Sequence, residues 1–195
     1  MITVKQLERT WTAKQYQRLY GELVACRPEA EMPVDFEAGW TLPAAAMAII
    51  RMEELSQSHV PLCRQLLRLI LAAQLPEGSW GDLTVTALCL RALLCGQGEG
   101  LAIDRGMDFL KRLQKPDGLW PKYPHERMPE DAAVSAFIAY ELGDQPAFQA
   151  AVRMDDLTDW FTSNEPFLNG DARELWNRAA RRCAAPARVM AQSWS

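Results

Sequence analysis

The chain of 195 residues is 49% hydrophobic and 24% charged, a balance that excludes a largely disordered protein and predicts a single domain over residues 1–195. Its net charge of -4 provides no basic field to attract phosphates, so we expect no nucleic-acid partner. No apolar run approaches the roughly 18 to 20 residues that span a bilayer, and residues 1–20 are too polar for a signal peptide, so we expect a cytoplasmic protein with no membrane span.

Hydrophobic periodicity predicts helices along the chain, and no strand signal has comparable strength. The predicted fold class is therefore all-α, with about eight helices arranged as four α/α hairpins. In chain order, the predicted helices span residues 3–23, 43–55, 62–73, 83–94, 103–113, 132–140, 145–161 and 171–183.

The predicted helices differ in how many of their sides are apolar. Residues 62–73 and 103–113 carry apolar side chains on one side and charged side chains on the other, as solvent-facing helices do. Residues 83–94 and 132–140 are apolar nearly all round, which predicts helices buried on both sides. The alternation of the two kinds predicts a double layer in which the all-apolar helices form the inner row.

A pattern of Gln, Gly and Trp is repeated where an outer helix leads into an inner one. Its two copies are Gln74, Gly78 and Trp80, and Gln114, Gly118 and Trp120. The residues after each copy also align, residues 82–93 with residues 131–142. Two consecutive repeats of helix, turn and helix are therefore predicted. Trp40 and Trp160 mark weaker copies on either side.

The second copy resembles the QW motif of the terpenoid cyclases and the related protein prenyltransferases. That motif has a basic, a small, an aromatic and an aliphatic residue before its Gln, Gly and Trp, and the matching residues here are Arg105, Gly106, Phe109, Leu110, Gln114, Gly118 and Trp120. The resemblance implies an α/α toroid around an apolar cavity. At roughly 40 residues per hairpin the chain is short of a full ring, so we expect a partial or reduced toroid.

The same resemblance implies a position for a catalytic acid. Class II terpenoid cyclases carry an Asp-rich motif at the start of an inner helix, and its nearest match is residues 128–133, with Glu130 in the acid's position beside Asp131. The alternative is helix initiation, because a proline near the first turn and acidic residues near the positive helix end are typical of helix starts.

The segment of residues 122–131, which lengthens the second repeat, is the other candidate site. Repeat proteins carry such insertions on one face, and that face often binds. His125 could exchange a proton near neutral pH, with Glu126, Glu130 or Asp131 orienting it. An ordinary charged surface loop is the alternative interpretation.

Metal and cofactor chemistry has weaker support, and we expect neither. Asp155, Asp156 and Asp159 have the spacing of the magnesium-binding cluster of class I terpene synthases, but a second metal-binding motif is missing and acidic runs usually mark exposed helix faces. The catalytic zinc of prenyltransferases needs an Asp-x-Cys pair, which the sequence lacks. The five cysteines are scattered without a Cys-x-x-Cys pair, which argues against disulfides and structural zinc.

Two functions fit these features. In the first, the inner helices bind an isoprenoid-like or other apolar small molecule, and catalysis by Glu130, Asp131 or His125 stays open. In the second, the chain is a non-catalytic helical-repeat module that binds a protein or peptide, or that completes its ring in a homo- or hetero-oligomer. The apolar inner helices favour the first function, whereas the incomplete catalytic motifs and the short chain favour the second.

Overall fold

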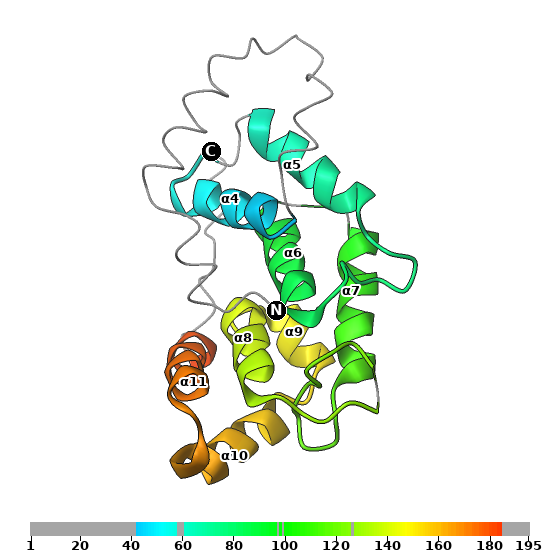
Figure 1. Ribbon diagram of the computed structural model, residues 1–195. Coiled ribbons are helices and arrows are strands. Elements are labelled where there is room, and N and C mark those ends of the chain that lie inside the picture. Colours follow the sequence, from blue (N-terminus) through cyan, green and yellow to red (C-terminus); the bar gives the residue numbers. More distant parts are fainter. Residues whose placement is uncertain (1–41, 58–60, 97, 99, 126, 185–195) are drawn as a thin grey trace.

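The computed structural model describes residues 42–57, 61–96, 98, 100–125 and 127–184, and these residues form eight α-helices, one short 3-10 helix and no strand (Figure 1). The prediction of an all-α fold is confirmed. The predicted helix at 3–23, Trp40 and Glu126 lie outside the described residues. The helices are α4 (Leu42–Glu54), α5 (Pro61–Ala72), α6 (Leu83–Cys95), α7 (Gly100–Leu113), α8 (Ala132–Leu142), α9 (Pro146–Ala151), α10 (Met154–Asn164), η1 (Glu165–Phe167) and α11 (Gly170–Ala184).

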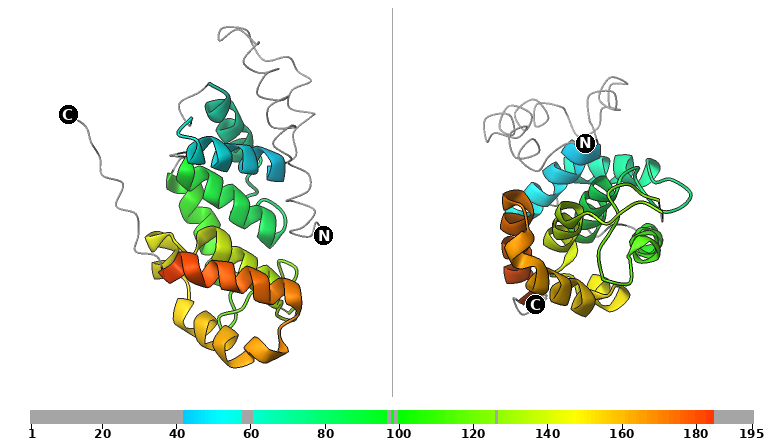
Figure 2. Two further views of the ribbon diagram at one scale, coloured as in Figure 1. Left: turned by 90° about the vertical axis from the view of Figure 1, so that its left-hand side faces the viewer. Right: turned by 60° about the horizontal axis from the view of Figure 1, so that its bottom comes forward.

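Four helices, α4, α6, α8 and α11, pack side by side in that order as a first row, which the left view of Figure 2 shows one below another. The two middle helices, α6 and α8, are largely buried, with eight buried residues each. The prediction that residues 83–94 and 132–140 form helices buried on both sides is therefore confirmed. At the end of the row, α11 buries one face against α8 and exposes its charged face.

We call α5, α7 and α10, each of which has one buried and one exposed face, the second row. The buried residues of α5 are Cys63, Leu66 and Ile70, which recur at helical spacing, while Arg64 and Arg68 of the same helix are exposed. α5 packs on α4, and α7 packs on α6. None of the described helices is long and apolar enough to cross a membrane.

Two equivalent turns connect the second row to the first, and we call them the first turn (residues 74–80) and the second turn (residues 114–120). In the first turn the Gln74 side-chain amide donates to Gly78 O at 3.0 Å and to Ala102 O of α7 at 2.8 Å. The Trp80 indole N–H donates to Ile70 O at 2.7 Å, which ties the turn back to α5.

The second turn repeats these contacts one helix further along. Gln114 donates to Gly118 O at 2.9 Å and to Arg153 O at 3.3 Å, and its side-chain oxygen accepts the Arg153 backbone N–H at 2.8 Å. The Trp120 indole N–H donates to Leu110 O at 2.8 Å. The first turn therefore joins α5 to α7, and the second joins α7 to the start of α10.

Each turn also places a glycine directly on the backbone of the next second-row helix. Gly78 and Gly118 have φ of 98° and 83°, a conformation that glycine adopts without steric cost. A Cβ atom at Gly78 would lie 2.3 Å from Arg105 O, and one at Gly118 would lie 2.3 Å from Leu157 N. A larger residue cannot occupy either position unless neighbouring second-row helices move apart.

The prediction of one helix over residues 145–161 is wrong, because the structure divides this segment into α9 and α10. Val152 is extended, with φ of -116° and ψ of 168°. The backbone N–H of Arg153 is then bound by Gln114 of the second turn instead of by a helical carbonyl. The second turn thus supplies a hydrogen-bond partner at the point where α9 has ended and α10 begins.

Candidate functional site

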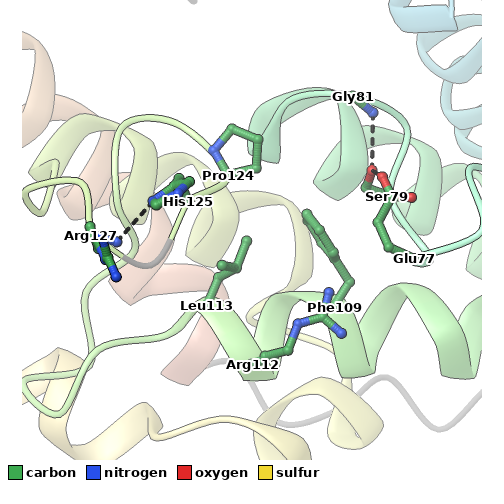
Figure 3. Close-up of a pocket in the computed structure, with 9 residues that line it drawn as sticks. All are labelled: Glu77, Ser79, Gly81, Phe109, Arg112, Leu113, Pro124, His125 and Arg127. Atoms are coloured by element: carbon green, nitrogen blue, oxygen red, sulfur yellow. Dashed lines mark hydrogen bonds between the residues drawn. The ribbon is translucent and has the colours of Figure 1, made fainter.

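A pocket of about 640 Å³ lies between the first turn and the loop of residues 121–131, above α7 (Figure 3). It is placed at the end of the molecule where α6 and α8 begin, because the first turn leads into α6 and the loop leads into α8. Its lining residues are Glu77, Ser79, Gly81, Phe109, Arg112, Leu113, Pro124, His125 and Arg127.

The pocket combines an apolar floor with charged walls. Phe109 and Leu113 are buried residues of α7, and the Arg112 guanidinium carbon lies 5.5 Å from the centre of the Phe109 ring. The charged walls contain two arginines, Arg112 and Arg127, and one carboxylate, Glu77, so positive charge is in excess. Such a lining can accept a small molecule that carries an apolar portion and an anionic group.

The Glu77 carboxylate is held in its ionised form. Its own backbone N–H, then the Ser79 hydroxyl at 2.8 Å and the nearby Arg112, lower the pKa of this carboxyl group from its ordinary value. Glu77 therefore remains anionic at neutral pH and carries a charge opposite to those of the two arginines in the lining.

His125 lies in the pocket wall on an exposed part of the loop. Its Nδ1 atom accepts the backbone N–H of Arg127 at 3.1 Å, and its own backbone N–H donates to Tyr123 O at 2.6 Å. A neutral His125 in this arrangement carries its proton on Nε2, since Nδ1 is an acceptor. The ring can then donate a hydrogen bond to a ligand without breaking the contact that shapes the loop.

The two predicted acids lie apart from the pocket lining. Glu130 is exposed and forms an isolated β-bridge with Pro121. Asp131 is the N-cap of α8, and its carboxylate accepts the Val134 backbone N–H at 3.0 Å. Asp82 makes the same contact with Val85 at 2.8 Å at the start of α6. Of the three candidate catalytic residues, the structure brings His125 to the pocket, and it gives Asp131 the contacts of a helix start.

Replacing Asp131 with Ala is expected to lower the free energy of unfolding by about 1 kcal/mol, because the first turn of α8 loses its cap. Asp82→Ala should cost a similar amount, and Asp131→Asn should cost much less because an amide oxygen also caps. Urea unfolding of the three variants measures these changes. An Asp131→Ala variant as stable as the unaltered chain would show that the cap contributes nothing.

The acidic run of α10 lies on an exposed helix face. Asp155, Asp156 and Asp159 are exposed, and the first two lie in the first turn of the helix, near its positive end. Among the described residues, no group of three or more His, Cys, Asp or Glu side chains is arranged to hold a metal ion.

A second pocket of about 550 Å³ lies beside the end of α7 and shares Arg112 with the first. Its other lining residues are Asp108, Lys111, Gln114, Ala151 and Arg153. Lys111 and Arg112 belong to the last turn of α7, where basic side chains are favoured by the negative helix end. The Gln114 side chain is already engaged by the second turn. The end of α7 therefore accounts for Lys111 and Arg112, and the Arg153 backbone is held by the second turn.

A buried charged cluster at the opposite ends of α6 and α8 was not predicted. We call Arg91, Glu141, Asp144 and Arg182 the buried cluster. Arg91 binds Asp144 with an Nη1 to Oδ1 distance of 2.6 Å, and Arg182 lies 3.7 Å from the other Asp144 oxygen. Burial raises the pKa of the Glu141 carboxyl to about 7, although Arg182 and Arg91 act in the opposite direction. The signal in the sequence is that Arg91 and Glu141 are the sole charged residues of α6 and α8.

The pocket and the buried cluster thus lie at the two ends of the dry helices α6 and α8. The pocket is open and contains His125, whereas in the buried cluster Arg91, Asp144 and Arg182 are partly exposed around the buried Glu141, whose pKa is raised by burial. Comparison of the chain with protein-family models, curated proteins and solved structures gives no significant match.

Proposed function

We propose that this protein binds a small amphiphilic molecule, an isoprenoid-like chain with an anionic group, in the pocket between the first turn and the loop of residues 121–131. The observation that carries the proposal is the composition of the lining. Arg112 and Arg127 provide positive charge directly beside the apolar surface of Phe109 and Leu113. An anionic group can bind the guanidinium groups while an apolar chain covers the floor.

The isoprenoid-like character of the ligand comes from the resemblance to the terpenoid cyclase and prenyltransferase superfamily. That resemblance is based on the residues of the two turns, and we propose membership of the superfamily together with the ligand class. The two helical rows would then be an arc of a reduced toroid. The residues that line the pocket determine the choice of site.

The proposal concerns binding, and His125 is the predicted acid–base residue with access to the ligand. Glu130 and Asp131 are not among the residues that line the pocket. If acid catalysis accompanies binding, Glu130→Gln should leave it intact and His125→Gln should reduce it, because only the second change alters the pocket wall.

A module that binds a protein or peptide is the second candidate, and one observation favours it. Helices α6 and α8 are buried nearly all round, so an apolar ligand cannot lie along them as it would along the inner helices of an open toroid. A binding partner would instead contact the exposed faces of the rows.

The test is calorimetric titration with farnesyl phosphate, farnesol and inorganic phosphate at one ionic strength. Farnesyl phosphate should bind more tightly than either of the other two, since it fills both parts of the pocket. Arg112→Gln and Arg127→Gln should each weaken its binding about tenfold, the loss expected for one charged contact of about 1.4 kcal/mol. Arg68→Gln on the exposed face of α5 is the matched control and should change nothing.

Three results would contradict the proposal. Equal binding of farnesyl phosphate and farnesol would remove the role of the arginines. Equal losses in Arg68→Gln and Arg112→Gln would indicate a general charge effect. Absence of binding by all three compounds to the folded protein would leave the partner-binding module as the better candidate.

A further inference from the structure

We propose that this protein forms a two-fold symmetric dimer, in which Phe167 of each copy lies in the pocket of the other copy. Phe167 belongs to η1, between α10 and α11. Among the large apolar side chains of the described residues it is the most exposed, at 85%. The dimer depends on the lining of the pocket and not on the small molecule proposed above as its ligand.

The turn that carries Phe167, which we call the Phe167 turn (residues 165–168), is held in one conformation by its own contacts. The Nη2 atom of Arg173 donates to main-chain oxygens of this turn, those of Glu165 at 2.9 Å, Pro166 at 3.3 Å and Leu168 at 3.4 Å. The ring of Pro166 also restricts the backbone directly before Phe167. A turn that is already ordered loses little conformational entropy when it binds.

The Phe167 turn lies at the same end of the first row as the pocket. Near the end of α11, Arg182 donates to Tyr140 O in the last turn of α8 at 2.8 Å. The Sγ atom of Cys183 would lie 2.3 Å from a Cβ at Gly143, the residue after α8. Helix α11 therefore runs parallel to α8. Its start, which directly follows the Phe167 turn, lies at the end of the row where α8 begins and the pocket is found.

The Phe167 turn carries the two chemical groups for which the pocket is built. Phe167 supplies an aromatic side chain for the apolar floor, where Phe109 offers a ring for an aromatic contact. Glu165, an exposed carboxylate of the same short helix, supplies a negative charge for the two arginines of the lining. The positive excess in the pocket and the carboxylate beside Phe167 are therefore complementary.

The contact must join two molecules, and symmetry makes it occur twice. Phe167 is exposed and is not among the residues that line the pocket of its own copy. One aromatic side chain covers much less than the roughly 1,200–2,000 Å² that stable interfaces bury. Because the Phe167 turn and the pocket lie at the same end, two copies that face each other can form both contacts. The second contact then forms within one pair of molecules, which strengthens the association.

Sedimentation equilibrium of the full chain, at protein concentrations up to about 1 mM so that weak association is covered, tests the dimer. The unaltered chain should show a monomer–dimer equilibrium. Phe167→Ser should raise the dissociation constant about a hundredfold, because each of the two contacts loses an aromatic side chain that contributes about tenfold. Leu101→Ser is the matched control and should change nothing, since Leu101 is 70% exposed at the start of α7 and is not in the pocket lining.

Mixing two variants tests whether Phe167 of one copy binds the pocket of the other. A variant with Arg112→Glu and Arg127→Glu keeps Phe167 but reverses the charge of its pocket, whereas Phe167→Ser keeps the pocket. Each variant alone has neither contact and should be monomeric. An equimolar mixture keeps one contact, so it should associate more strongly than either variant alone and more weakly than the unaltered chain. Circular dichroism confirms that each variant is folded.

The dimer is refuted if the unaltered chain stays monomeric over the whole concentration range. It is also refuted if Leu101→Ser weakens association as much as Phe167→Ser, or if the mixture of variants associates no more strongly than its components. The sedimentation samples contain no ligand. Their outcome is therefore separate from that of the titration with farnesyl phosphate, and either proposal can fail without the other.

Discussion

Gly118→Ala is expected to lower the free energy of unfolding by about 3 kcal/mol, because the added methyl group meets both a dihedral and a steric penalty. Gly118 has φ of 83°, which an L-residue adopts at a cost, and its Cβ would lie 2.3 Å from Leu157 N and 2.7 Å from Leu157 Cα. Backbone atoms cannot rotate away as a side chain can. The second turn must therefore separate from α10, and urea unfolding measures the loss.

Gly81 provides a matched control for this prediction. Its φ is 99°, so alanine meets the same dihedral penalty, but nothing lies within 4 Å of an added Cβ. Gly81→Ala should therefore cost about 1 kcal/mol, and the difference between the two variants measures the close approach to α10. Equal losses at Gly81 and Gly118 would show that the turn does not depend on this contact.

Trp120→Ala is expected to lower the free energy of unfolding by about 4 kcal/mol, the usual cost of removing a large aromatic side chain from a core. Trp120 is 0% exposed, its ring stacks on Phe148 at 6.1 Å between centres, and its indole N–H binds Leu110 O at 2.8 Å. Because the free energy of unfolding of typical domains is about 5–15 kcal/mol, this one change removes a large part of it. Thermal and urea unfolding both measure it.

Two further variants separate the contributions. Trp160, in α10, is partly buried and makes an edge-to-face contact with Phe161, so Trp160→Ala should cost clearly less than Trp120→Ala. Trp120→Phe keeps an aromatic ring but removes the hydrogen bond to Leu110 O. Its loss of unfolding free energy should fall between those of Trp160→Ala and Trp120→Ala. If Trp120→Ala and Trp160→Ala proved equally stable, the second turn would not be anchored by its tryptophan.

The rows of helices could be predicted because burial leaves a direct trace in the sequence. A helix with a polar side must show that side to water, so residues 62–73 and 103–113 could be assigned to exposed helices. Residues 83–94 and 132–140 have no such side, and they form the buried α6 and α8. The break between α9 and α10 was not predicted, and the hydrogen bond that satisfies the Arg153 backbone there comes from Gln114, which lies far from Arg153 in the sequence.

The candidate site could be predicted only in part, for the same reason. His125 was identified from its place in the loop, and it lines the pocket. Glu77 and Arg112 come from the first turn and from α7, and they meet His125 only after the helices have packed. Glu141 could have been noticed as the single charge on an apolar helix, but the arginines whose charges act on it, Arg91 and Arg182, come from two other helices.

The hydrogen bonds of the two turns bear on how proteins of this design change length in evolution. The side-chain amides of Gln74 and Gln114 donate to main-chain carbonyl oxygens of Ala102 and Arg153, and every amino acid carries such an oxygen. A duplicated hairpin would therefore find a main-chain acceptor wherever it was inserted, although the Gln74 side-chain oxygen also accepts a hydrogen bond from the Arg105 side chain at 2.6 Å and so needs a basic neighbour.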